Sequence, residues 1–139
     1  VCLWLRTYLF SKPEGDPTEE IRRRIADFTA TLGLGDKKIP RIELIAEQVP
    51  SEQLPGLYLA CDCYVAPSRG EGWGRPQHEA MLMERPVIAT NWSANTEFMT
   101  EETSYLIDYE MVEARGLEPE LWHYKGHRWA NPSETHCDR

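Results

Sequence analysis

The sequence predicts an α/β fold with a doubly wound parallel sheet and helices on both faces of that sheet. Short apolar segments typical of buried strands alternate along the chain with amphipathic segments typical of helices. Polar or glycine-rich loops follow two of the expected strands, and ligands of such sheets bind at the carboxyl ends of the strands. The length of 139 residues suffices for one domain with a hydrophobic core.

The residues before position 50 predict two strands and one helix. The apolar run VCLWLRTYLF begins with a strand at Val1, and IELIA within Ile39–Val49 predicts the second strand. Asp16-Pro17 between them predicts a helix start, because aspartate caps a helix and proline suits its first turn. Gly33 predicts the end of this helix. One helix face would carry apolar residues spaced four, three and four apart: Ile21, Ile25, Phe28 and Leu32.

The next sixty or so residues repeat the alternation of helix and strand. Ser51 predicts a capped helix start, and Pro76 predicts the first residue of a helix that bears Glu79. The expected strands are Cys63–Ala66, Val87–Thr90 and Ser104–Tyr109, with a polar loop at Asn91–Ala94 and a short helix at Thr96–Met99. Residues 1–109 therefore predict one domain. Residues 110–139 predict an irregular tail and the start of a C-terminal helix at Asn131.

The loop SRGEGWG at residues 68–74 carries the strongest functional signal. Its alternating glycines let a ligand approach the main chain, and the following helix start directs free N–H groups at the loop, which suits phosphate. Glu71 and Glu79 frame the loop, and ionised carboxylates accept hydrogen bonds from hydroxyls. A nucleoside diphosphate joined to a sugar combines both features, and we expect both carboxylates to face one cleft. The alternative is a plain glycine-rich connection in which Glu79 only stabilises the helix dipole.

The segment EGWGRPQHE, from Glu71 to Glu79, resembles the E-x7-E signature of retaining glycosyltransferases of the GT-B architecture, group 1 (family GT4). The resemblance extends from Ser51 to Tyr109 and includes PVIAT and the following Asn-x-Glu. It implies the Rossmann-like, C-terminal, donor-binding half of a GT-B fold, incomplete at both ends. The first βα unit of that half and the whole acceptor-binding N-terminal domain would then precede Val1.

The resemblance also implies roles for individual residues. Glu71 would be the catalytic residue and contact hydroxyls of the donor sugar, whereas Glu79 would contact the ribose hydroxyls. The nucleobase would dock near Glu47, Gln48 and Val49. The other implied donor-binding residues are Arg69, Gly72, Trp73, Gly74, Arg75, Gln77, Asn95 and Glu97. Trp73 and Arg75 depart from the family, which often has a smaller aromatic and an apolar residue there, and Arg75 equally suits a phosphate contact or solvent.

The implied activity is transfer of a sugar, of the hexose type, from a nucleoside-diphosphate sugar to an unknown acceptor with retained stereochemistry. Electrostatic stabilisation of the departing diphosphate would drive it, without a metal or cofactor. The chain alone would be nearly inactive, because the family's diphosphate-gripping cationic pair and its acceptor domain would be missing. The alternatives are a non-catalytic sugar-nucleotide-binding or interaction module and a GT-B sugar-nucleotide epimerase. A phosphorylase is disfavoured because no lysine lies in a plausible cofactor pocket.

Composition limits the partners. The net charge of −8 argues against a general nucleic-acid or membrane-surface binder. No apolar run approaches the roughly 20 residues that span a bilayer. We interpret the 4 cysteines as reduced packing residues, which favours a cytoplasmic protein without a zinc site. A missing βα unit would expose a sheet edge or face and favour a homo-oligomer.

Overall fold

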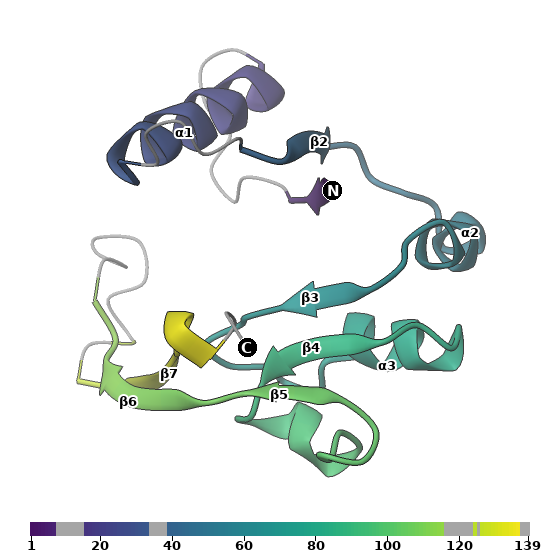
Figure 1. Ribbon diagram of the computed structural model, residues 1–139, viewed down its shortest axis with the longest axis vertical. Helices are drawn as coiled ribbons and strands as arrows, with labels where there is room; N and C mark the ends of the chain where they lie inside the picture. Colours follow the sequence, from purple (N-terminus) through teal and green to yellow (C-terminus); the bar gives the residue numbers. More distant parts are fainter. Residues whose placement is uncertain (8–15, 34–38, 116–123, 125, 137–139) are drawn as a thin grey trace. The chain divides into compact units, whose positions relative to one another are not determined.

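The computed structural model describes the chain except for residues 8–15, 34–38, 116–123, 125 and 137–139. It divides into two compact units, Val1–Val49 and Pro50–Arg139, and each is considered by itself. Both units combine helices with parallel strands (Figure 1). The predicted α/β class with parallel sheets is therefore confirmed.

The first unit is a strand–helix–strand arrangement. Strands β1 (Cys2–Arg6) and β2 (Arg41–Ile45) pair in parallel, and helix α1 (Pro17–Thr31) lies between them in the chain. The Asp16 carboxylate accepts a hydrogen bond of 2.8 Å from the Thr18 backbone N–H, which confirms the predicted cap. Gly33 follows the helix with a φ of 57°, as a helix-ending glycine should.

The second unit contains a parallel sheet of three strands in the order β3 (Tyr64–Ala66), β4 (Val87–Thr90) and β5 (Tyr105–Ile107). The 3-10 turn η1 (Ser51–Gln53) and helix α2 (Leu54–Leu59) precede the sheet. Helix α3 (Arg75–Leu82) connects β3 to β4, and the 3-10 turn η2 (Ala94–Glu97) lies between β4 and β5. None of the helices in the described ranges is long and apolar enough to cross a membrane.

The core of the second unit gathers around β4, the central strand, because both of its neighbours and helix α3 pack against it. Val87 and Ala89 on β4 are fully buried, as is Ala80 on α3. The complete buried cluster is Tyr58, Ala66, Ala80, Val87, Ala89 and Met99. This core fixes where β3 and β4 end, and so fixes the two loops that follow them.

The region after Tyr109 differs from the predicted irregular tail. Strands β6 (Tyr109–Glu113) and β7 (Arg128–Pro132) form an antiparallel ribbon in which Glu113 lies opposite Arg128. A short 3-10 turn η4 (Glu134–His136) follows, so the helix start predicted at Asn131 is wrong, since that residue belongs to β7. The ribbon escaped prediction because its strands are short and polar, and strand propensity depends on partners far along the chain.

Three local predictions also need correction. Ser51 does not cap a helix: it is the first residue of η1, and no side chain caps either η1 or α2. Helix α3 begins one residue before Pro76, with Gly74 as its N-cap. Glu97 lies at the end of η2 rather than near the start of a short helix.

Candidate functional site

The loop between β3 and α3 is fixed at Gly74, where only glycine fits. Its φ is 80°, and a Cβ atom added there would lie 2.9 Å from the Cβ of Asn95. Both the backbone conformation and the close approach therefore exclude a side chain. At Gly72, in contrast, an added Cβ would meet no atom of the described residues within 4 Å. The loop is thus pinned to η2 at one end and open at the other.

Glu71, in the open part of the loop, is held through both its backbone and its side chain. Its backbone N–H donates to the Ser93 hydroxyl at 3.2 Å, and that hydroxyl donates to the Glu71 carbonyl oxygen at 2.7 Å. Its carboxylate Oε1 accepts a hydrogen bond of 3.2 Å from the side-chain amide of Gln77. A neutral amide thus orients the carboxylate without neutralising its charge.

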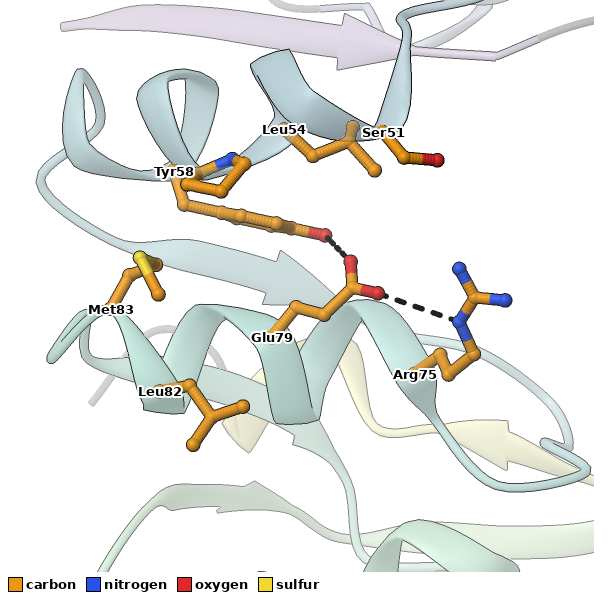
Figure 2. A pocket seen from close by; sticks show the side chains of 8 residues that line it. Ser51, Leu54, Tyr58, Arg75, Glu79, Leu82 and Met83 are labelled. Carbon is orange, nitrogen blue, oxygen red and sulfur yellow. Dashed lines mark hydrogen bonds and ion pairs between the residues drawn. The ribbon is translucent and has the colours of Figure 1, made fainter.

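Glu79, on α3, is held by a hydroxyl and a cation. The Tyr58 hydroxyl donates to its Oε2 at 3.0 Å, and the Arg75 Nε lies 3.4 Å from its Oε1. Figure 2 shows the Glu79 carboxylate between these two groups, at the edge of a cavity of about 200 Å³. Mainly apolar atoms line this cavity, and its residues are Ser51, Leu54, Pro55, Tyr58, Arg75, Glu79, Leu82 and Met83.

Glu71 lines a second and larger cavity, of about 550 Å³. Its lining residues are Arg69, Gly70, Glu71, Gly72, Trp92, Ala114, Tyr124, His127, Arg128 and Trp129. The prediction that Glu71 and Glu79 share one cleft is therefore wrong. The reason is helical phase: residues two apart on a helix point about 200° apart, so Gln77 faces Glu71 while Glu79 faces α2.

Two predicted donor-binding residues, Gln77 and Asn95, support the loop from within, and a third, Trp73, belongs to the loop itself. Gln77 and Asn95 are each 1% exposed, and the Asn95 amide donates to the Thr90 carbonyl oxygen at 3.0 Å. Each also carries a buried side-chain oxygen without a hydrogen-bond partner among the described residues, as does Thr90. Trp73 packs against His78 and Phe98, with ring centroids 6.3 and 5.6 Å away, and stays 48% exposed.

Arg69 and Glu97 complete the predicted set within this unit. The Arg69 guanidinium donates to the Asn131 side chain at 3.1 Å and lies 4.8 Å from the centre of the Trp129 ring. Its carbonyl oxygen accepts from the Ala130 N–H at 3.1 Å, so Arg69 ties the loop to the ribbon. Glu97 is exposed and lines neither of these cavities.

The residues predicted for the nucleobase belong to the first unit. Glu47 and Gln48 line a cavity of about 420 Å³ together with Arg6, Thr7 and Ala46. This cavity lies where β1 and β2 end, which is where sheets of this kind bind ligands. Val49 follows these residues without lining the cavity.

Sequence reasoning missed several residues that shape the two cavities. Ser93 lies in the predicted polar loop, so a hydroxyl placed opposite Glu71 could have been suspected. Tyr58 carries no signal in the sequence beyond its place in the helix expected after Ser51. Trp92 had no signal beyond its position after β4, and the ribbon residues Arg128 and Trp129 had none, because the ribbon was not predicted.

Comparison with known proteins identifies the family. Residues 14–115 match the family model of glycosyl transferases group 1, and the chain belongs to this family. It is also 36% identical over 98 residues to the lipopolysaccharide core biosynthesis mannosyltransferase LpsB of Rhizobium meliloti (strain 1021). That alignment covers 68% of the chain and 25% of the relative, so the chain spans about a quarter of the relative's length. No solved structure matches the chain.

Proposed function

We propose that the chain is the donor-binding part of a retaining glycosyltransferase of family GT4, which moves a sugar from a nucleoside-diphosphate sugar to an acceptor. One observation carries the proposal: the loop pinned at Gly74 holds Glu71 beside one cavity, and helix α3, which begins directly after it, holds Glu79 beside another. The donor would then span the N-terminus of α3 instead of filling one cleft. The E-x7-E interpretation of these two glutamates is part of the proposal.

The diphosphate lies over the first turn of α3 in this arrangement. The first backbone N–H groups of a helix have no intrahelical partner and carry the positive end of its dipole, which suits an anion. Arg75 is 77% exposed and its contact with Glu79 is long, at 3.4 Å. Its guanidinium is therefore able to turn from Glu79 to a phosphate oxygen.

Glu79 and Tyr58 take the ribose in the smaller cavity. A carboxylate accepts hydrogen bonds from ribose hydroxyls, while the Tyr58 hydroxyl keeps that carboxylate in place. The assignment of the nucleobase to Glu47, Gln48 and Val49 concerns the first unit and stays a prediction from the resemblance.

Glu71 takes the sugar on the other side of α3, where Gly72 leaves the backbone open. As the bond to the diphosphate breaks, the helix N-terminus stabilises the charge on the leaving group, and Glu71 holds the sugar hydroxyls. Neither a metal nor a cofactor is needed for this role. The relative's name, a mannosyltransferase, makes a mannosyl donor the first hexose to test.

The proposal also covers the longer protein, self-association of the chain and its location in the cell. Because the chain spans about a quarter of its relative, turnover is assigned to a longer protein with an acceptor-binding domain, and the 139 residues alone are expected to be nearly inactive. Self-association through an exposed sheet edge is expected, and light scattering measures it. A cytoplasmic location fits the free thiols of Cys2, Cys61 and Cys63.

Two-dimensional NMR of the isotope-labelled chain tests the donor site, because it detects weak binding. Titration with nucleoside diphosphates should first shift the amide signals of Arg75, of residues 77–79 and of Tyr58. Glu79→Gln should weaken binding about tenfold, whereas Glu102→Gln, at an exposed position of the same unit, should leave it unchanged. Equal binding by the two variants would refute the assignment of Glu79.

The second candidate function is a non-catalytic binding module. It stays a candidate because the alignment covers only 25% of the mannosyltransferase relative. Such a module would bind the nucleotide at the same residues without turnover. A turnover assay of the longer protein with a panel of sugar nucleotides separates the two, because only an enzyme releases nucleoside diphosphate.

A further inference from the structure

The cavity beside Glu71 has a second wall that the proposed donor site does not use. The loop after β3 forms one wall, through Arg69, Gly70, Glu71 and Gly72. The ribbon and the segment leading into β7 form the other, through Ala114, Tyr124, His127, Arg128 and Trp129. A volume of about 550 Å³ leaves room beyond the sugar of a donor.

The lining of this cavity, taken over both walls, is more basic than the protein as a whole. The chain has 23 acidic and 15 basic residues, yet two arginines and a histidine line this cavity against one carboxylate, Glu71. The Arg128 guanidinium donates to the Met111 carbonyl oxygen across the ribbon, which fixes its position at the wall. Two arginines against one carboxylate, in a protein of opposite net charge, favour an anionic ligand.

The same cavity offers two anchored aromatic rings. The Trp92 ring packs against Tyr109, with ring centroids 5.3 Å apart, and remains 36% exposed. The Trp129 ring is held by the Arg69 guanidinium, 4.8 Å from its centre. Rings fixed in this way provide apolar surface at low entropic cost, and the C–H faces of a sugar ring pack against such surfaces.

A small inorganic anion would need the cations but not the tryptophans, and a neutral sugar would need the tryptophans but not the cations. We propose that this cavity binds an acidic saccharide, a sugar ring that carries a carboxylate or a phosphate group, against its ribbon wall. Its ring lies against Trp92 and Trp129, and its anionic group meets Arg128 and His127. The proposal does not rest on the proposed function, because none of these four residues belongs to the proposed donor site.

The test is an NMR titration of the full chain in which the indole N–H signals of Trp92 and Trp129 report binding. The probes are methyl glucuronide, glucose 6-phosphate and, as the neutral match, methyl glucoside. We expect the acidic probes to bind at least about tenfold more tightly than methyl glucoside. High salt should remove this preference, because these cations are solvent-exposed. The two acidic probes distinguish carboxylate from phosphate recognition.

Arg128→Gln and Arg115→Gln form a matched pair of variants. Both arginines belong to or flank the ribbon, but Arg115 pairs with Glu113 and does not line the cavity. Arg128→Gln should abolish the preference for acidic probes, and Arg115→Gln should preserve it. If Arg128→Gln fails to fold, the test is whether high salt removes the preference of the unaltered chain for the acidic probes. Equal binding of acidic and neutral probes, or no shift of either indole signal, would overturn the proposal.

A nucleoside diphosphate serves as the competitor that separates this proposal from the proposed function. It should bind without displacing methyl glucuronide, and Glu79→Gln should weaken the nucleotide alone. If the nucleotide displaces the acidic probe and loses affinity in Arg128→Gln, the cations hold the donor diphosphate and the acidic-saccharide site is refuted. If the acidic probe binds while no nucleotide does, the donor assignment fails and the saccharide site stands.

Discussion

Glu71 and Glu79 are chemically identical but are positioned in different ways. Glu79 takes its direction from the regular backbone of α3 and is held by Tyr58 and Arg75 beside a small, mainly apolar cavity. Glu71 lies on a loop, is held by the neutral amide of Gln77, and lines a larger cavity with basic side chains. A carboxylate on a helix therefore needs few supports, whereas one on a loop needs a buried framework.

That framework consists of Gly74, Gln77, Ser93 and Asn95, which pin the loop from below. The comparison implies that substitutions under the loop disturb Glu71 while leaving Glu79 in place.

Gly74→Ala should cost the most stability, about 1–3 kcal/mol, because alanine is strained at a φ of 80° and its Cβ would meet Asn95. Urea unfolding of the purified chain measures the change. Gly72→Ala is the control, since its Cβ would meet no atom of the described residues within 4 Å, and it should stay within about 0.5 kcal/mol of the unaltered chain. Equal losses in the two variants would show that the loop is not pinned at Gly74.

Ser93→Ala should cost about 1–2 kcal/mol, because it removes both hydrogen bonds to the Glu71 backbone. The sharper readout is structural: amide signals of residues 70–73 should shift in NMR spectra, and the signal of Glu79 should not. Shifts that spread equally to Glu79 would mean that the two carboxylates are coupled, and would contradict the claim that Glu71 and Glu79 are supported independently.

Tyr58→Phe should cost about 1 kcal/mol or less, because it removes the hydroxyl that donates to Glu79 while the ring stays packed against Tyr64. Nucleoside diphosphate binding should weaken by severalfold, as measured by titration. Binding of methyl glucuronide should be unchanged. A loss of saccharide binding instead would place the two ligands on the same side of α3.

The smallest effect concerns the two thiols between α2 and β3. Burial, and secondarily the charge of Asp62, raises the pKa of Cys61 and of Cys63 above the ordinary thiol value. A raised pKa leaves less thiolate near neutral pH, so both should react more slowly with iodoacetamide than in the chain unfolded by urea. The rates should converge as the pH rises above the pKa in the folded chain. Mass spectrometry of the alkylated chain measures the rates. Equal rates for the folded and the unfolded chain near neutral pH would contradict the raised pKa of the two thiols.

Much of the fold could be predicted because its signals are local. The Asp16 cap, the Gly33 stop and the alternation of strands with helices depend on neighbouring residues, and the structure confirms them. The β6–β7 ribbon could not be predicted, because its two strands meet across a long connection and neither has a strong pattern of its own.

For the candidate site, the sequence indicates candidate residues but does not determine how they are arranged. The loop motif identified Glu71 and Glu79, yet the expected common cleft overlooked the phase of α3. Gln77 and Asn95 were expected near the ligand and prove to be buried supports, because burial depends on how η2 packs under the loop. Such packing depends on tertiary contacts that no local pattern contains.

The most direct test of the central claim compares a nucleoside diphosphate with the matching nucleoside-diphosphate hexose by calorimetry, in the longer protein. If the donor spans the N-terminus of α3, Glu79→Gln weakens both ligands by the same factor. Glu71→Gln should remove only the additional affinity that the hexose contributes. A Glu71→Gln variant that weakens both ligands equally, or a Glu79→Gln variant that weakens neither, would contradict the account.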